Sequence, residues 1–184
     1  TLLVATRHEP KIVAAIQDST GGRTEAGSLR FSESNLQANV DNLTIHGLEP
    51  PDAAPFVRIR NVMVKLRLFT NHQIVNVSSV VVNQPAVNIM TLADGRSNIP
   101  SPQTSSPPSD KPLKPVVDLA IGHFEINQGW LSLDQSKIPL YARVDDLKAR
   151  LDYSVAGSTY GGQISFAPVY VMSGRRTPVR VDVK

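Results

Sequence analysis

The segment from Ile74 to Pro100, IVNVSSVVVNQPAVNIMTLADGRSNIP, constrains the fold more than any other stretch of this chain. It contains a run of β-branched residues, a proline, a second short β run and Asp94-Gly95, which is typical of a tight turn. Because proline removes a hydrogen bond from a strand ladder, we expect Pro85 to interrupt the strand. The centre of the segment, Asn83 to Ile89 (NQPAVNI), is echoed by Asn127 to Leu133 (NQGWLSL). A repeated unit of this kind predicts a sheet whose surface is the functional part.

Apolar and polar residues alternate with a period of two through most of the chain, which indicates β-strands. The longest such signal runs from Phe56 to Thr70. The alternation slips by one residue near Asp41-Asn42, which predicts a bulge or a strand switch. A second echo relates Ala38 to Leu43 with Ala142 to Leu147. Together these signals predict roughly nine or ten antiparallel strands.

One helix is expected, near the start of the sequence. Glu9-Pro10 suits a first helical turn, because proline tolerates the missing hydrogen bond there and glutamate favours the positive end of the helix dipole. Gly21-Gly22 should end the helix about three turns later. The helix carries a short apolar stripe that includes Ile12, Val13 and Ile16.

The composition excludes several classes of protein. The chain has 184 residues, of which 41% are hydrophobic, so it is neither disordered nor embedded in a membrane. It has no cysteine, which rules out disulfides, thiol catalysis and cysteine-based zinc sites. The net charge of +3 is too small and too scattered to indicate nucleic-acid binding. The chain begins with Thr1 and its last residues resemble a strand in progress, so we expect a fragment of a longer protein.

Candidate catalytic and metal-binding residues all have a plainer interpretation. The four histidines show no helical metal spacing and no acidic partner in motif spacing, so we expect surface or turn roles for them. Asp145-Asp146 is expected to be a polar bulge rather than an acid–base pair. Gly21-Gly22 and Gly161-Gly162 lack the context of a phosphate loop, so turn and cap roles are expected. No serine lies in a nucleophile elbow. We therefore predict no enzymatic activity, no metal and no cofactor.

The apolar side of each strand must be covered by something, and the residues leave three solutions open. A sandwich buries two apolar faces against each other, a barrel encloses them, and an open curved sheet leaves a trough for a ligand. Composition alone favours the sandwich, because sandwiches are common.

Several segments, in this order, resemble the AsmA-like superfamily, specifically the amino-terminal region of TamB-like translocation and assembly proteins. The resemblance extends from about Pro10 to Ala167. The segments that carry it are Thr20-Gly21-Gly22, Asn42 to Gly47 (NLTIHG), Val80 to Ile89 (VVVNQPAVNI), Asp94 to Pro100 (DGRSNIP), and Ile121 to Leu133 with Asn127-Gln128-Gly129 at its centre.

The resemblance implies an inner-membrane-anchored protein of a diderm bacterium that projects into the periplasm. It implies a role in phospholipid transport and outer-membrane biogenesis, with an outer-membrane assembly protein as a possible partner. The membrane anchor would lie before Thr1. The resemblance also favours the open groove, an antiparallel curved sheet with an aliphatic concave face.

On this interpretation the chain has four parts. Residues 1–22 form the helix and cap, residues 23–100 a first β-groove section, and residues 101–115 a flexible loop rich in proline and serine. Residues 116–184 form a second groove section that continues beyond the fragment. The helix would cap the inner-membrane end of the groove.

The aliphatic strand residues are the candidate contacts for phospholipid acyl chains. The alternative, from another class, is a structural or adhesive β-sandwich that binds a protein partner by edge pairing. The candidate lipid contacts are Val62, Val64, Leu66, Leu68, Val80, Val82, Val87, Ile89, Leu119, Ile121, Leu131 and Leu133.

Overall fold

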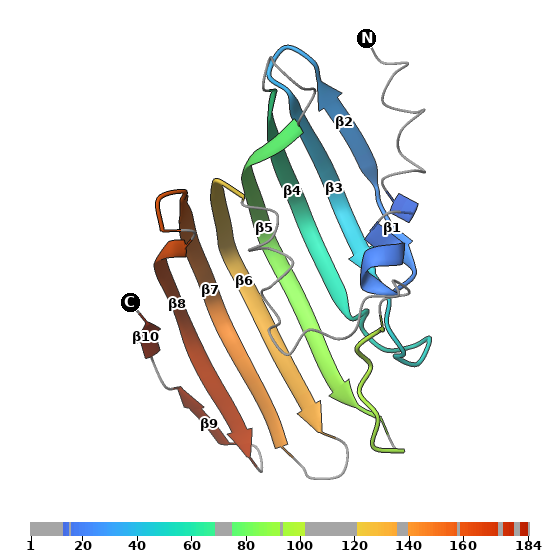
Figure 1. Ribbon diagram of the computed structural model, residues 1–184. Coiled ribbons are helices and arrows are strands. Elements are labelled where there is room, and N and C mark those ends of the chain that lie inside the picture. Colours follow the sequence, from blue (N-terminus) through green and yellow to red (C-terminus); the bar gives the residue numbers. More distant parts are fainter. Residues whose placement is uncertain are drawn as a thin grey trace.

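The fold is a single open β-sheet with a short helix at one end. The computed structural model describes residues 13–14, 16–68, 75–92, 94–101, 121–135, 140–157, 159–172, 175–178 and 181–183. Its ten strands all belong to one mixed, mostly antiparallel sheet, in the order β1-β3-β4-β5-β6-β7-β8-β10 (Figure 1). The strands are β1 (Thr24–Glu25), β2 (Ser28–Ser32), β3 (Gln37–Ile45), β4 (Val57–Leu68), β5 (Val75–Thr91), β6 (His123–Gln135), β7 (Leu140–Ser154), β8 (Thr159–Met172), β9 (Arg175–Pro178) and β10 (Val181–Val183).

Both edges of the sheet are built from two short strands. β1 and β2 both pair with β3, while β9 and β10 both pair with β8. The described strands form no second layer, so a sandwich of the chain's own described strands is not present. No helix in the described part of the chain is long and apolar enough to cross a membrane.

The expectation of a wholly antiparallel sheet is wrong at one position. β5 and β6 run parallel, with Ser79 opposite His123 and Thr91 opposite Gln135. Parallel neighbours need a crossover connection of about a dozen residues or more, whereas antiparallel neighbours need only a tight turn. The proline- and serine-rich loop predicted at 101–115 falls within this connection, and its residues from 102 onward lie outside the described residues.

Pro85 does not interrupt its strand, contrary to the expectation from the sequence. β5 continues through it for 17 residues, and Pro85 pairs with Ile59 of β4. The preceding residue, Gln84, has a φ of 52°, which marks a local irregularity where a proline is tolerated inside a sheet. β6 likewise forms one strand through Gly129. A Cβ at Gly129 would lie 2.9 Å from the Pro85 ring, so the glycine makes room for the proline.

The helix ends where the sequence predicts. Residues 13–14 and 16–20 are helical, and Gly21 adopts the left-handed conformation with a φ of 73°. Its N–H donates to the carbonyl of Gln17 at 2.7 Å, which is typical of a glycine helix cap. The predicted start at Glu9-Pro10 lies outside the described residues.

Five consecutive strands carry a pair of adjacent polar residues, and the pairs of β3 to β6 lie at the same level of the sheet. In four of these strands one residue of the pair has a left-handed backbone: Asn42 (φ 52°), Gln84 (52°), Gln128 (54°) and Asp146 (51°). The bulges predicted at Asp41-Asn42 and Asp145-Asp146 are therefore confirmed as local irregularities, the second with a register shift against β8. We call the row across β3 to β6 the polar crease; it comprises Asp41-Asn42, Arg60-Asn61, Asn83-Gln84 and Asn127-Gln128. The Asp145-Asp146 pair of β7 is offset from this row and lies between the pairings of Gly129 with Leu147 and of Leu131 with Val144.

Candidate functional site

Most of the candidate lipid contacts come together on one face of the sheet. The register places Val62 opposite Val82 and Val64 opposite Val80. Across the parallel pair, Val87 lies opposite Leu131 and Ile89 lies opposite Leu133. Because side chains alternate between the two faces of a strand and the crease shifts that alternation by one, the apolar residues on both sides of the crease share one face. Nine of the twelve candidates lie on it: Val62, Val64, Leu66, Val80, Val82, Val87, Ile89, Leu131 and Leu133.

The other three candidates have different positions. Ile121 precedes β6 and is 95% buried. Leu119 lies outside the described residues, and so does the side chain of Leu68, although its backbone belongs to β4. The register adds residues that the sequence interpretation did not select, although they follow the same alternation: Phe124, Ile126, Val144, Ala149, Leu151 and Ile164.

This apolar face is closed at one end and half-exposed elsewhere. Leu29, Val40 and Leu43 form a buried cluster, on which Ile16 of the helix packs. Beyond this cluster most apolar side chains on the described part of the face are half-buried; Ile45, Pro85 and Ala149 are buried, and Leu133 is 39% exposed. A sheet that faced a second apolar layer would bury these side chains much further. The face from β4 to β8 is therefore an apolar surface of one layer.

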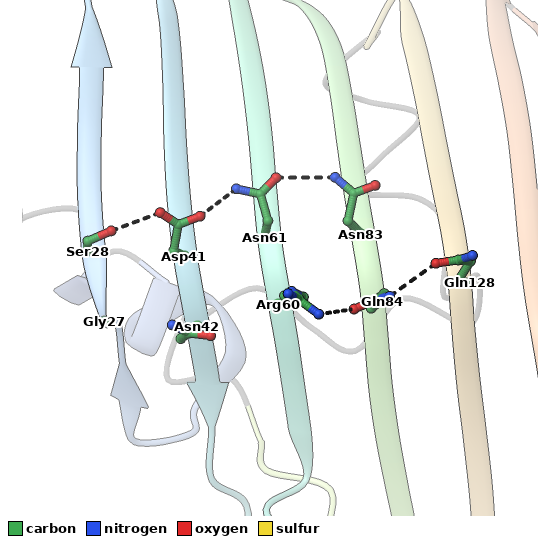
Figure 2. Close-up of a pocket in the computed structure, with 9 residues that line it drawn as sticks. All are labelled: Gly27, Ser28, Asp41, Asn42, Arg60, Asn61, Asn83, Gln84 and Gln128. Atoms are coloured by element: carbon green, nitrogen blue, oxygen red, sulfur yellow. Dashed lines mark hydrogen bonds between the residues drawn. The ribbon is translucent and has the colours of Figure 1, made fainter.

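The opposite face carries an open polar depression of about 800 Å³ over the crease. Figure 2 shows two hydrogen-bonded rows that cross neighbouring strands there. In the first row Asn61 donates to Asp41 at 2.8 Å, Asn83 donates to Asn61 at 3.2 Å, and Asn127 donates to Asn83 at 3.1 Å.

The second row runs beside the first. Arg60 donates to the Gln84 side-chain carbonyl at 3.1 Å, and the Gln84 amide donates to Gln128 at 3.1 Å. At the β2 end of the first row, Ser28 and Arg30 both donate to Asp41, at 2.9 and 2.6 Å. Hydrogen bonds from Asn61 and Ser28 lower the pKa of Asp41 below its usual value of 3.8, so this carboxylate is charged at neutral pH.

His123 of β6 lies between two carboxylates on the polar face, which the sequence interpretation missed. Its Nδ1 lies 2.7 Å from Asp152 of β7, and its Nε2 lies 3.2 Å from Glu125. Hydrogen bonds to Asp152 and Glu125 raise the pKa of His123 above 6.5. The hydrogen bond from His123 lowers the pKa of Glu125 below 4.5. Asp152 follows 29 residues later in the sequence, so only the β6–β7 register could have indicated this contact.

We expect this cluster to make stability depend on pH. A raised histidine pKa stabilises the fold below about pH 6.5, and this contribution is lost as the pH rises through the folded-state value. A lowered glutamate pKa stabilises the fold above about pH 4.5 and is lost at lower pH. The urea concentration at the unfolding midpoint should therefore decrease as the pH is raised from 6 to 8. In His123→Gln this decrease should be smaller. An equally steep fall in the variant would contradict the assignment.

Other candidate residues have local structural partners. Arg143 pairs with Asp145 and stacks over the ring of Trp130 at 4.7 Å, while Lys148 pairs with Asp146 at 2.8 Å. His46 lies 3.1 Å from Glu49, so both His46 and His123 have an acidic neighbour that the spacing of the sequence did not indicate. His8 and His72 lie outside the described residues. Within the described ranges, no group of three His, Asp or Glu side chains is arranged to hold a metal ion.

The geometry defines an open one-layer β protein with an apolar and a polar face. No family model matches this chain, and no curated protein sequence matches it either.

Proposed function

We propose that the apolar face binds the acyl chains of phospholipids, as one segment of a periplasmic lipid-transport and outer-membrane biogenesis protein. The observation that supports this proposal is the one-sided face of β4 to β8, where most aliphatic side chains are only half-buried in a single layer. The resemblance to TamB-like proteins supports the same role. The tether to the inner membrane and an outer-membrane assembly partner belong to the proposal. It also requires the sheet to curve, so that the apolar face forms an open groove.

Elementary energetics make such a face useful. Each buried methylene is worth about 0.8 kcal/mol, so a sixteen-carbon chain exposed to water costs roughly 12 kcal/mol. Contact with Val, Leu and Ile side chains removes much of this cost. Dispersion contacts with a fluid chain are non-directional, so a smooth apolar strip suffices and no precise pocket is needed.

The position of the helix indicates which part of the apolar face is open to acyl chains. It packs over Leu29, Val40 and Leu43, so the apolar face near β2 and β3 is covered by protein. Acyl chains would therefore lie over β4 to β8, and the helix would close one end of the strip. The role is binding and shielding; the proposal contains no catalytic step.

The test is the amount of phospholipid that stays with the purified protein, measured by mass spectrometry after extraction. We expect Leu66→Glu to lower retained phospholipid at least tenfold, because a charge on the strip disfavours a bound acyl chain. Leu66 is only half-buried, so the variant should stay folded. Lys65→Glu is the matched control, since Lys65 is exposed on the opposite face of the same strand, and it should retain phospholipid.

Absence of phospholipid from the unmodified protein, or equal retention by both variants, would contradict the proposal. The alternative function was a β-sandwich that binds a protein partner by edge pairing. Since the described strands form one layer, only the edge pairing is left to consider. Both edges consist of short strands, which is how natural sheets discourage edge pairing. The structure therefore offers less support for that role than for lipid binding.

A further inference from the structure

The polar depression over the crease lies on the face that the lipid proposal does not use. Its position follows from the register: Val40 belongs to the buried cluster and Val62 packs against it, so Asp41 and Asn61 face the other way. Gly27 lies at its β2 end, where a Cβ would come within 3.1 Å of the Asn42 side chain and 3.2 Å of the Asp41 carbonyl. The geometry points to a binding site for a neutral oligosaccharide on this face, independent of the proposed lipid function.

The side chains of the depression are held in place before any ligand arrives. Asn61 and Asn83 each donate one hydrogen bond along their row and accept another, and so does Gln84 in the second row. A side chain fixed in this way loses little further conformational entropy when it binds a ligand. Preorganisation of this kind favours binding by hydrogen bonds alone.

Each amide in the rows keeps unused hydrogen-bonding capacity. A side-chain amide has two N–H donors and two carbonyl lone pairs. The two hydrogen bonds that each amide makes within its row use one donor and one lone pair. One donor and one acceptor therefore remain on Asn61, Asn83 and Gln84. A sugar hydroxyl both donates and accepts, so it can satisfy such a pair. Phosphodiester and carboxylate groups only accept.

The spacing and the charge of the depression narrow the ligand class. Amides recur from strand to strand at about 4.8 Å, which suits a ligand with repeating rings. Asp41 is compensated by Arg30 at 2.6 Å, which leaves Arg60 as the principal charge of the depression. An anionic polymer would need a cation for each repeat, whereas β5 and β6 offer Gln84 and Gln128. An apolar ligand is disfavoured because the depression is open and lined by polar residues.

The experiment is a titration of the ¹⁵N-labelled chain with cellotetraose and chitotetraose, with side-chain amide signals of Asn and Gln recorded by NMR. We expect saturable shifts of the Gln84 and Gln128 side-chain amides, with weak binding in the millimolar range. Arg60→Met should weaken binding at least tenfold, because it removes the guanidinium and keeps the aliphatic stem. Gln84→Gly should do the same and keeps a residue that tolerates a φ of 52°.

The matched control is Arg58→Met, which changes the same residue type two positions away on β4 and outside the depression. It should bind both oligosaccharides like the unmodified chain. Absence of saturable shifts, or equal weakening by Arg58→Met and Arg60→Met, would overturn the inference. Phospholipid retention by Arg60→Met is measured in parallel. Because the two sites lie on opposite faces, loss of sugar binding should leave retained lipid unchanged, so the two proposals fail separately.

Discussion

Gly162→Ala is expected to lower the free energy of unfolding by about 3 kcal/mol. Gly162 lies inside β8 opposite Leu151, where the two strands approach closely. A Cβ at this position would lie 1.9 Å from the backbone carbonyl oxygen of Arg150 and 2.9 Å from the Leu151 Cα. Because these are backbone atoms, no rotamer change can relieve the overlap, and the strands must move apart.

The neighbouring glycine supplies a matched control. A Cβ at Gly161 would meet no atom within 4 Å. Its φ is not positive, so alanine fits the backbone and should stabilise the fold by about 0.5 kcal/mol through the unfolded state. Urea unfolding followed by the fluorescence of Trp130, the only tryptophan, measures both variants. Equal unfolding midpoints for the two variants would contradict the close approach of β7 and β8.

Asn98→Ala is expected to cost about 3 kcal/mol, because it leaves two partly buried backbone groups of β5 without a partner. Asn98 has no exposed surface. Its side-chain carbonyl accepts from the Met90 N–H at 2.9 Å, and its side-chain amide donates to the Asn88 carbonyl at 2.9 Å. Its backbone N–H also donates to the Met90 carbonyl at 3.0 Å. The residue thus takes the place of a neighbouring strand where β4 no longer pairs with β5.

Asn35→Ala is the control for this prediction, since Asn35 is exposed in the turn between β2 and β3. We expect a change below about 0.5 kcal/mol, as for most surface substitutions. Denaturant unfolding of both variants gives the comparison. The assigned role of Asn98 is wrong if Asn98→Ala unfolds at the same urea concentration as Asn35→Ala.

The echo between Asn83–Ile89 and Asn127–Leu133 corresponds to the register in which β5 pairs with β6. Its offset is the pairing of β5 with β6, in which Asn83 lies opposite Asn127. Asn127 donates to Asn83 at 3.1 Å, and Ser132 donates to Asn88 at 3.0 Å. The sequence therefore contained the partner relation between these strands, although we expected only a repeated strand type and an antiparallel direction.

The polar crease was partly predictable from the alternation of the sequence. Two adjacent polar residues between apolar ones at Asp41-Asn42 predict a local irregularity, because the alternation must keep the apolar side chains on one face. The same reasoning predicts the irregularity at Asp145-Asp146. It could not predict that Asp41-Asn42 and the pairs of β4 to β6 form one row, since alignment depends on the register of strands distant in sequence.

The Gly161-Gly162 pair shows the limit of local reasoning. We expected a turn or cap role, but both glycines lie within β8. Composition favours a turn at two adjacent glycines. The reason for Gly162 is instead the nearness of the β7 backbone at Arg150, which belongs to a different strand.

The sequence by itself determined what depends on neighbouring residues. The alternation predicted the strands, Gly21-Gly22 predicted the end of the helix, and Asp94-Gly95 predicted a turn, confirmed by the φ of 91° at Gly95. These features follow from backbone geometry and side-chain alternation, which are local properties.

Only the tertiary structure decided which strands are neighbours and what each face contacts. It set β5 and β6 parallel, carried β5 through Pro85, placed Asn98 against the β5 backbone and left the apolar face in one layer. The physical reason is that each neighbouring strand satisfies only half of a strand's backbone hydrogen bonds, and that neighbours within a sheet cover neither of its faces. Which neighbour it takes is decided by the packing of segments far apart in the chain.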